Sequence, residues 1–399
     1  MANPQHTPDD IVIVGAARTP TGRFLGGLSS LPATALGAIA IKGALEQAGV
    51  NPDRVDAVVF GQVLQAGAGQ NPTKQAALGA GVPQRAHTNT VNKVCLSGLT
   101  AIIDGSRMLK VGDAEVVVAG GMESMSNAPH LLSNSRTGTR YGAATMKDHM
   151  ESDGLTCARL GISMGELTET HADRYPVTRQ EQDSLALHSH QAAHDAWEDG
   201  TFDREVVPVT VSTRKGETVV SRDEGIRAGL SQQDLDKLSP AFVKDGSITV
   251  AHASQISDGA SAVVLTRRGT AQDNGWPVLA TVCAAGQVAG PDSSLQAQPA
   301  NAIEQALARQ GWSAAELDHV EINEAFADVV IHSARQLGVD MSTVNPAGGA
   351  LALGHPIGAS GARLVVHAAH RIAAGKSHRA AVGLCGGGGQ GEALLLEDA

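Results

Sequence analysis

Three side chains stand in local sequence that suits covalent chemistry: Cys95, His355 and Cys385. Cys95 lies between an apolar strand pattern that ends near Val91 and a helical pattern that begins near Leu96. Its sulfur would face the N-terminus of that helix, where the helix dipole stabilises a thiolate. The small residues that follow leave the Cys95 amide free to donate to an oxyanion. A single cysteine is more often a small buried residue, so the prediction of a nucleophile depends on the motifs around it.

His355 occurs in a run rich in glycine, Gly-Gly-Ala-Leu-Ala-Leu-Gly-His-Pro-Ile-Gly-Ala-Ser-Gly. Glycine permits close approach of the backbone, and proline fixes the direction of the turn. An imidazole placed there suits a general base or an oxyanion donor, because its ordinary pKa lies near neutrality.

Cys385 ends an apolar strand pattern and precedes four glycines, Gly386 to Gly389. This arrangement delivers a second thiol and several unencumbered amides to one place. A glycine run can also hold a phosphate, but the Gly-Lys-Ser/Thr sequence of a P-loop does not follow here. We therefore expect Cys385 to act on the substrate itself.

Asn323 follows another apolar strand pattern and begins the run Asn-Glu-Ala-Phe. Its amide could hold a water molecule as an oxyanion donor. The alternative is a helix cap with Glu324 in the first turn of the helix.

Two histidine pairs have the spacing of metal ligands, His190 with His194 and His367 with His370. Neither pair has the glutamate of an HExxH motif or a third ligand nearby in sequence. The sequence therefore predicts no metal site.

An internal repeat divides the chain into two similar parts. Val55-Asp-Ala-Val reappears as Leu317-Asp-His-Val, an offset of 262 residues that an Ala-Leu pair and a glycine upstream also keep. Farther on, the Val-Asn and Ser-Gly pairs around Cys95 reappear around His355, with ten extra residues between them. Each copy continues into a helix, at about 97–111 and 359–374, and then a strand. Such alternation predicts βαβ units, largely parallel sheets and an α/β fold made of two similar halves.

Residues from about 125 to 250 have no counterpart in the repeat and are more polar, with a Met-rich turn from Gly121 to Met125 before them and a helix near 179–199. Apolar positions on that helix argue against a disordered linker. We expect an N-terminal half formed by 1–124 with 251–276, an inserted loop domain at 125–250, and a C-terminal half at 277–399.

Composition narrows the class of protein. A formal net charge of −11 opposes attraction to nucleic acid or to an anionic membrane, so a polyanionic ligand needs a local basic pocket. Four scattered cysteines without a CxxC pair fit a reducing cytoplasm. The first ten residues lack a basic segment followed by an apolar one, and no run of 18 apolar residues occurs, so we expect no export signal and no membrane span.

Together the motifs resemble the thiolase family over essentially the whole chain. They are Val-Asn-Lys-Val-Cys-Leu-Ser-Gly at 91–98, Gly-Gly-Met-Glu-Ser-Met-Ser at 120–126, Asn-Glu-Ala-Phe at 323–326, Gly-His-Pro-Ile-Gly-Ala-Ser-Gly at 354–361, and Cys385 before its glycines. The resemblance implies a five-layered α-β-α-β-α core with a loop domain that binds coenzyme A. It implies an acyltransferase that cleaves 3-oxoacyl-CoA or runs the reverse Claisen condensation, in fatty acid metabolism such as β-oxidation.

The resemblance also assigns roles to residues of this chain. Cys95 would carry the acyl group after activation by His355, and Cys385 would move the proton at the α-carbon of acetyl-CoA. One oxyanion hole would use His355 and a water held by Asn323. The other would use the amides of Cys95 and Gly387.

The expected partners are acyl-CoA, acetyl-CoA and CoA, which are substrates, so no separate cofactor is expected. In the loop domain Arg227 resembles a contact near the nucleotide, Ser254 a contact near the pantetheine, and Met164 part of the same site. A surface salt bridge is the other interpretation of Arg227. Homodimers or homotetramers are implied as well.

Four positions depart from the family pattern and bear on the acyl pocket, leaving the acyl chain length open. They are Ser163, His252, Gly386 and Asp328. A β-ketoacyl synthase-like enzyme would share the fold but lack a second cysteine. A thiolase-like carrier of acyl-CoA or lipid would have the fold without turnover.

Overall fold

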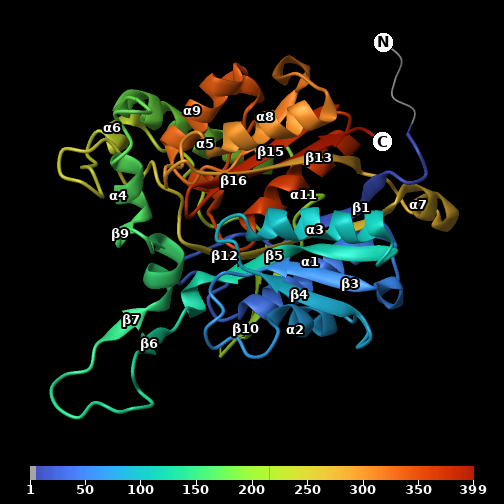
Figure 1. The fold of residues 1–399 in the computed structure, drawn as a ribbon, viewed down its shortest axis with the longest axis horizontal. Helices are drawn as coiled ribbons and strands as arrows, with labels where there is room; N and C mark the ends of the chain where they lie inside the picture. Colours follow the sequence, from blue (N-terminus) through green and yellow to red (C-terminus); the bar gives the residue numbers. More distant parts are fainter. Residues whose placement is uncertain (1–5, 215) are drawn as a thin grey trace.

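The computed structural model describes residues 6–214 and 216–399. Residues 1–5 lie outside the described residues. The predictions that they belong to the N-terminal half and form part of a segment without an export signal therefore concern residues that are not described. Figure 1 shows two layered halves side by side, with the middle of the chain looping out and returning.

The N-terminal half is a sheet with the strand order β4-β3-β5-β12-β1. Its strands are β1 (Ile11–Arg18), β3 (Ala57–Gly61), β4 (His87–Val91), β5 (Val116–Ser124) and β12 (Ser257–Arg267), with the short β2 (Gly22–Arg23) beside β12. Its helices are α1 (Ala33–Ala48), α2 (Pro72–Gly79), α3 (Ser97–Val111) and α7 (Arg268–Asn274). Apolar side chains alternate between the two faces of these strands and form separate cores on each side.

The C-terminal half repeats this arrangement as β14-β15-β16-β13. Its strands are β13 (Ala280–Ala289), β14 (His319–Ile322), β15 (Arg379–Gly386) and β16 (Gln390–Glu397). Its helices are α8 (Gln298–Gln310), α9 (Ala327–Leu337), α10 (Ala350–Leu353) and α11 (Ser360–Ala373). A parallel bridge between Val320 and Val344 stands where β4 pairs with β3 in the first half, which confirms the repeat.

A short antiparallel pairing of β1 with β13 joins the halves into one sheet path, through Val12 with Thr281 and Ile13 with Ala280. Helices α3 and α11 contact each other and strands of both halves, so they form the middle layer (Figure 1). Helices α1 and α2 cover the outer face of the first half, and α8 and α9 that of the second. The five-layered α/β architecture is therefore present.

The prediction of largely parallel sheets is wrong. Only β3 with β4, β3 with β5, and β14 with β15 are parallel among the main pairs, and β12, β16 and the central joint are antiparallel. The reason is that β15 returns through the tight turn at Gly387 to Gly389, and the long excursion after β5 returns in the opposite direction as β12. Neither connection is a βαβ crossover.

The middle of the chain holds small hairpins and helices. The pairs are β6 (His130–Leu132) with β7 (Met146–Asp148), β8 (Thr156–Cys157) with β9 (Ile162–Ser163), and β10 (Val209–Thr213) with β11 (Gly216–Val220); the helices are α4 (Met164–Glu169), α5 (Arg179–Glu198) and α6 (Gln232–Leu235). The β6–β7 hairpin projects from the body, and α5 packs on α9 and α10 of the second half (Figure 1).

The predicted turn from Gly121 to Met125 is instead the end of β5 and the start of a 3-10 helix, Met125–Asn127. The strand continues because it pairs with β12 as far as Ser124 and Asp258. No helix within 6–214 and 216–399 combines the length and the apolar character needed to cross a membrane.

Candidate active site

Most of the residues chosen from the sequence line one cavity of about 330 Å³. Its lining includes Cys95, His355, Cys385 and Gly387, together with Met164 and Ser254 from the inserted segment and its return. Much of the remaining wall is apolar, and Glu151, Thr156 and Ser163 add polar side chains to it. The apolar residues are Leu155, Phe242, Ile256, Leu295, Phe326 and Ile357. A larger hollow of about 470 Å³ lies between α5 and α9, and its lining contains neither cysteine.

Cys95 lies in a tight turn between β4 and α3. The preceding Val94 has φ of 53°, a left-handed conformation that a β-branched residue rarely adopts. Side chains hold this turn: Asn92 Oδ1 accepts from the Val94 amide at 3.1 Å, and Ser97 Oγ donates to the Val94 carbonyl at 2.6 Å. The strain presents Cys95 to the cavity at the end of the strand.

The thiol of Cys95 is neutral in the free protein, contrary to the expectation of a stabilised thiolate. Burial raises its pKa to about 12 and the carboxyl of Glu123 adds to the rise, whereas hydrogen bonds from the amides of Cys95 and Gly387 oppose it. Loss of water around the sulfur therefore outweighs the two amide hydrogen bonds that favour the thiolate. The two amides that point at this sulfur are the pair expected to form an oxyanion hole.

His355 is held with one ring nitrogen turned toward the site. Ser360 Oγ donates to the Pro356 carbonyl at 3.0 Å, so at 2.6 Å from His355 Nδ1 it must accept the proton of that nitrogen. The lone pair is then on Nε2, which lies 3.4 Å from Asn323 Nδ2. Burial, with a contribution from Arg363, lowers the pKa of His355 to about 3, so the ring is neutral and able to accept a proton at Nε2.

A buried carboxylate attaches the His355 loop to the first half of the molecule. Glu123, at the end of β5, accepts hydrogen bonds from the amides of Val63, Leu64 and Gly358 at 2.9 to 3.1 Å. Burial raises its pKa to about 7 despite those hydrogen bonds. The sequence alone gives Glu123 no role, because its partner Gly358 lies 235 residues away.

Cys385 is buried at the end of β15, beside the apolar cluster that includes Phe326 and Val329. Burial raises the pKa of its thiol far above the usual range, and Cys95 and Asp328 add to the rise. Gly386 follows where the sequence led us to expect an altered pocket. A Cβ there would lie 2.6 Å from Leu96 Cγ, so this glycine accommodates Leu96.

Asn323 sits directly after β14, behind His355, and is fully buried. Its backbone N–H donates to the Gly383 carbonyl at 3.0 Å, which fixes Asn323 at the strand end. The alternative of a helix cap is wrong, because α9 begins at Ala327 with Phe326 as its cap. No hydrogen bond reaches its buried Oδ1 from the described residues, and Asn323 is not part of the cavity lining.

The remaining predicted residues separate into those at the cavity and those away from it. Ser163 lines the cavity and caps α4, accepting from the Glu166 amide at 3.1 Å. The side chain of His252 is 2.7 Å from Asp183 on α5, outside the cavity lining. Arg227 is exposed, and its backbone amide donates to His190 Nδ1 at 3.0 Å.

His190, His367 and His370 each have a different partner. His190 accepts from Arg227, while His367 Nδ1 contacts Glu205 at 2.9 Å and His370 Nε2 donates to the Ala16 carbonyl at 2.6 Å.

Comparison with known proteins agrees with this arrangement. A family model described as "Thiolase, N-terminal domain" matches residues 11–269, and one described as "Thiolase, C-terminal domain" matches residues 276–398. The chain is 51% identical over 386 residues to a "Probable acetyl-CoA acetyltransferase" of Mycolicibacterium smegmatis, covering 96% of this chain and 100% of that protein. It is 46% identical over 388 residues to the "Acetyl-CoA acetyltransferase" of Pseudomonas aeruginosa, covering 97% and 99%. It is 44% identical over 393 residues to "Acetyl-CoA acetyltransferase 2" of Arabidopsis thaliana, covering 98% and 97%.

Proposed function

The chain belongs to the thiolase family, and we propose that it transfers acyl groups between coenzyme A thioesters through an acyl-Cys95 intermediate. It is an acyltransferase. The observation that carries the proposed chemistry is the convergence of the Cys95 and Gly387 amides on the Cys95 sulfur, in a cavity that also contains His355 and Cys385.

The cleavage direction begins at the ketone of a 3-oxoacyl-CoA. Cys95 gives its proton to His355 Nε2 and its sulfur attacks C3, whose oxygen becomes negative. The bond between C2 and C3 then breaks, its electron pair passes to C2, and Cys385 supplies a proton to C2. Acetyl-CoA leaves and the shortened acyl group remains on Cys95.

In the second step the thiol of free coenzyme A loses its proton to the Cys385 thiolate. The new thiolate attacks the acyl carbonyl, whose oxygen accepts hydrogen bonds from the amides of Cys95 and Gly387. The Cys95 sulfur leaves and recovers its proton from His355, so both thiols and the imidazole return to their starting states. The condensation of two acetyl-CoA molecules follows the same steps in reverse.

A short acyl group is the substrate we favour. The relatives are named for acetyl transfer, and the apolar wall around Ile256 and Ile357 can contact an acyl group. Arg227 for the nucleotide, and Ser254 and Met164 for the pantetheine arm, are our proposed contacts for coenzyme A. Ser254 and Met164 line the cavity, which supports their assignment, and Arg227 is an exposed cation.

A homo-oligomer, a cytoplasmic location and a part in fatty acid degradation complete the proposal. The free edge of β4 supports association, since within the described chain β4 pairs with β3 alone. Four cysteines without a disulfide support a reducing compartment.

The test is turnover and covalent capture with one set of substrates. The purified chain, given coenzyme A and acetoacetyl-CoA, should consume the 3-oxoacyl-CoA and form acetyl-CoA. Mass spectrometry after acid quenching should find an acetyl group on Cys95. Binding of acyl-CoA without either result would favour a carrier, and decarboxylative condensation without cleavage would favour a β-ketoacyl synthase-like enzyme. Longer 3-oxoacyl-CoA substrates then measure the acyl preference.

A further inference from the structure

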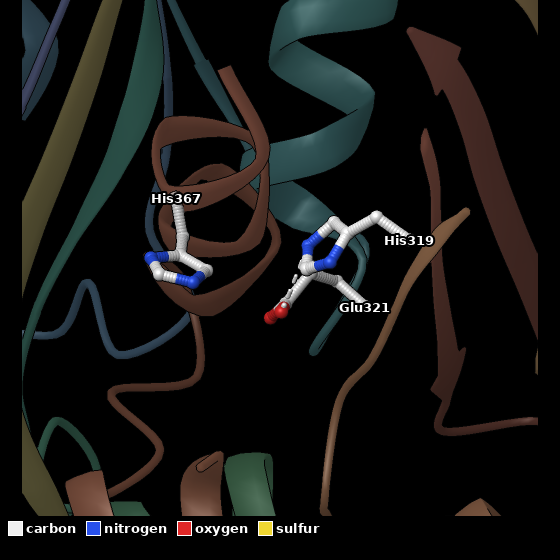
Figure 2. Close-up of side chains that lie close together, drawn as sticks. All are labelled: His319, Glu321 and His367. Atoms are coloured by element: carbon white, nitrogen blue, oxygen red, sulfur yellow. Dashed lines mark ion pairs between the residues drawn. The ribbon is translucent and has the colours of Figure 1, made fainter. Parts of the chain in front are cut away.

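A second cluster of chemical side chains lies in the interior, away from the cavity. His319 and Glu321 are two residues apart on β14, so they share one face of the strand, and His367 faces them from α11 (Figure 2). All three residues are buried, and none exposes more than 1% of its surface. One nitrogen or oxygen atom from each lies within 4.8 Å of the others.

Apart from the 3.2 Å contact between His319 Nε2 and Glu321 Oε1, the potential ligand atoms of this cluster have no well-formed hydrogen bond within the described residues. They are both ring nitrogens of His319, both carboxylate oxygens of Glu321, and Nε2 of His367. Buried polar atoms are nearly always paired, because burial removes the hydrogen bonds that water would give. One such atom from each of the three residues converges within 4.8 Å of the other two, which indicates a site that can bind a ligand between them.

His367 is oriented in the manner of a metal-binding histidine. Glu205 Oε2 lies 2.9 Å from its Nδ1, so the carboxylate accepts the proton of that nitrogen and the lone pair of Nε2 points into the cluster. Histidines that bind metals usually donate their other ring nitrogen to a carboxylate or a carbonyl. Glu205 is itself fixed by Arg18, whose Nε donates to Oε1 at 2.7 Å.

The nearby guanidinium of Arg363 faces the other side of the Glu321 carboxylate. It is 4.0 Å from Oε2, whereas His319 Nε2 is 3.2 Å from Oε1. One oxygen is therefore directed to the cation of Arg363 and the other to the histidines. The wider surroundings are mixed in charge: Glu205 and Asp223 are paired with Arg18, while Arg371 and His370 lie on the same helix as His367.

We propose that His319, Glu321 and His367 bind a divalent transition-metal cation, of which Zn²⁺ best matches two imidazoles and one carboxylate. Zinc takes nitrogen and oxygen ligands at about 2.0 to 2.2 Å in a tetrahedron, so the side chains need only small movements from their present spacing. A water molecule can take the fourth position. Because the ligands are buried, the ion has a structural role.

The ion would fasten β14 to α11. Asn323 directly follows β14 and Ser360 begins α11, so the site joins the two elements that position Asn323 and His355. The sequence did not reveal it, because His367 follows Glu321 by 46 residues and its helical neighbour His370 points to Ala16 instead.

The experiment measures metal content and stability in the full chain. Protein purified from medium with zinc should contain about one equivalent by plasma mass spectrometry, and anomalous diffraction at the zinc edge should place it between the three side chains. His319→Leu, which replaces the imidazole by an apolar side chain of similar size, should lower zinc content and affinity at least 10-fold. The matched control His378→Leu, at an exposed histidine of the same half, should retain the ion.

Stability provides a second measurement that does not depend on turnover. Removing zinc with dipicolinate should lower the melting temperature of the unsubstituted chain, and added Zn²⁺ should restore it. His319→Leu should respond to neither treatment. Less than a tenth of an equivalent after dialysis against Zn²⁺, zinc content unchanged by His319→Leu, or density at the cluster from water alone would each overturn the proposal. If His319→Leu does not fold, the anomalous map of the unsubstituted chain decides.

Discussion

The nucleophile and the proton-transfer thiol are both neutral S–H groups in the free protein, so each needs a base at the moment it reacts. Burial raises the pKa of Cys95 to about 12 and lowers that of His355 to about 3. Between those values the imidazole is free to accept a proton and the thiol still has one to give. Activation therefore depends on a proton transfer coupled to attack.

Substitution of the base should change the pH profile of acylation. In the unsubstituted chain the rate should change by much less than tenfold per pH unit from pH 6 to 9, because Cys95 and His355 do not titrate there and Glu123, with a pKa of about 7, acts on Cys95 only through its charge. In His355→Ala the thiolate must form by loss of a proton to solvent, so the rate should be about 10² to 10⁴-fold lower at pH 7 and rise about tenfold per pH unit. Quenched-flow mass spectrometry of the acetyl adduct measures both profiles. Parallel profiles would show that His355 is not the base, and His378→Ala is the control.

The second thiol should be separable from the first. Cys385→Ala should still form an acetyl adduct on Cys95 from acetyl-CoA, although slowly. Carbon–carbon bond formation or cleavage should fall by at least about 10³-fold, since the proton at the α-carbon has no carrier. Cys283→Ala provides a control, because Cys283 is partly buried outside the cavity lining. Normal cleavage by Cys385→Ala would remove this thiol from the mechanism.

Asp328 gives a pH-dependent contribution to stability. Burial raises its pKa from 3.8 to about 7, although Gln296 donates to it at 2.9 Å. Between about pH 4 and 7 the folded chain binds more protons than the unfolded one, so the free energy of unfolding falls as pH rises through this range. The raised pKa of Glu123 likewise lowers the free energy of unfolding as pH rises.

Asp328→Asn should therefore stabilise the chain at pH 8 and change little at pH 4. The gain is on the order of up to 4 kcal/mol, since one pKa unit corresponds to about 1.4 kcal/mol. Urea unfolding at several pH values measures it, with Asp9→Asn at an exposed position as the control. A variant that is equally or less stable at pH 8 would contradict the assignment of a costly buried charge.

At the scale of elements, local sequence predicts the helices well and the strand partners poorly. The helix expected at 97–111 is α3 (Ser97–Val111), and the helix expected near 179–199 is α5 (Arg179–Glu198). Periodicity and helix-ending glycine are local signals. The direction of β12 depends on the path of the roughly 130 residues between β5 and β12, and no local sequence pattern predicts that path.

The same distinction holds for the site. Cys95, His355 and Cys385 stand in local motifs and were predicted, whereas the role of Glu123 follows from its contact with Gly358, 235 residues away. Ser360 lies only five residues from His355, but which ring nitrogen it contacts depends on the folded turn. The ring of His252 lies beside Asp183, 69 residues away in sequence and outside the cavity lining, a placement that no local pattern predicts.

Close approach of β5 to the His355 loop is an element-scale requirement. A Cβ at Gly121 would lie 2.0 Å from the Gly358 carbonyl oxygen, so Gly121→Ala must displace that loop. We expect a loss of several kcal/mol in the free energy of unfolding, typical of severe overpacking, and loss of acylation in the fraction that folds. Gly79→Ala is the matched control: it is exposed in α2 and meets only the Ala38 Cβ, at 3.0 Å. Similar melting temperatures for both variants would contradict the close approach.

At the scale of the molecule, β4 is an edge whose outward groups can pair with a second copy. The His87 amide donates to the Asp56 carbonyl and the Val91 carbonyl accepts from Gln62, so alternation turns the amides of Thr88 and Thr90 outward.

If this edge joins two chains, Thr88→Pro should weaken association. Proline removes the outward N–H of residue 88, and it breaks no hydrogen bond to β3 because that N–H makes none. Sedimentation equilibrium should then detect the 40.9 kDa chain mass. Thr88→Val, which keeps the amide, should associate as the unsubstituted chain does. An unsubstituted chain that is monomeric, or a folded proline variant that remains fully associated, would rule out this edge.

The central position of β1 has a consequence for biosynthesis. Ile11 pairs with Arg267 and Val12 with Thr281, so the first strand to leave the ribosome has both neighbours near or beyond residue 260. At about 5 to 20 residues per second, roughly 10 to 50 seconds separate its emergence from that of its partners. During that interval a strand made for complete burial is without its sheet. Nascent chains stalled before residue 257 should therefore recruit holding chaperones that release them once β12 and β13 have been translated.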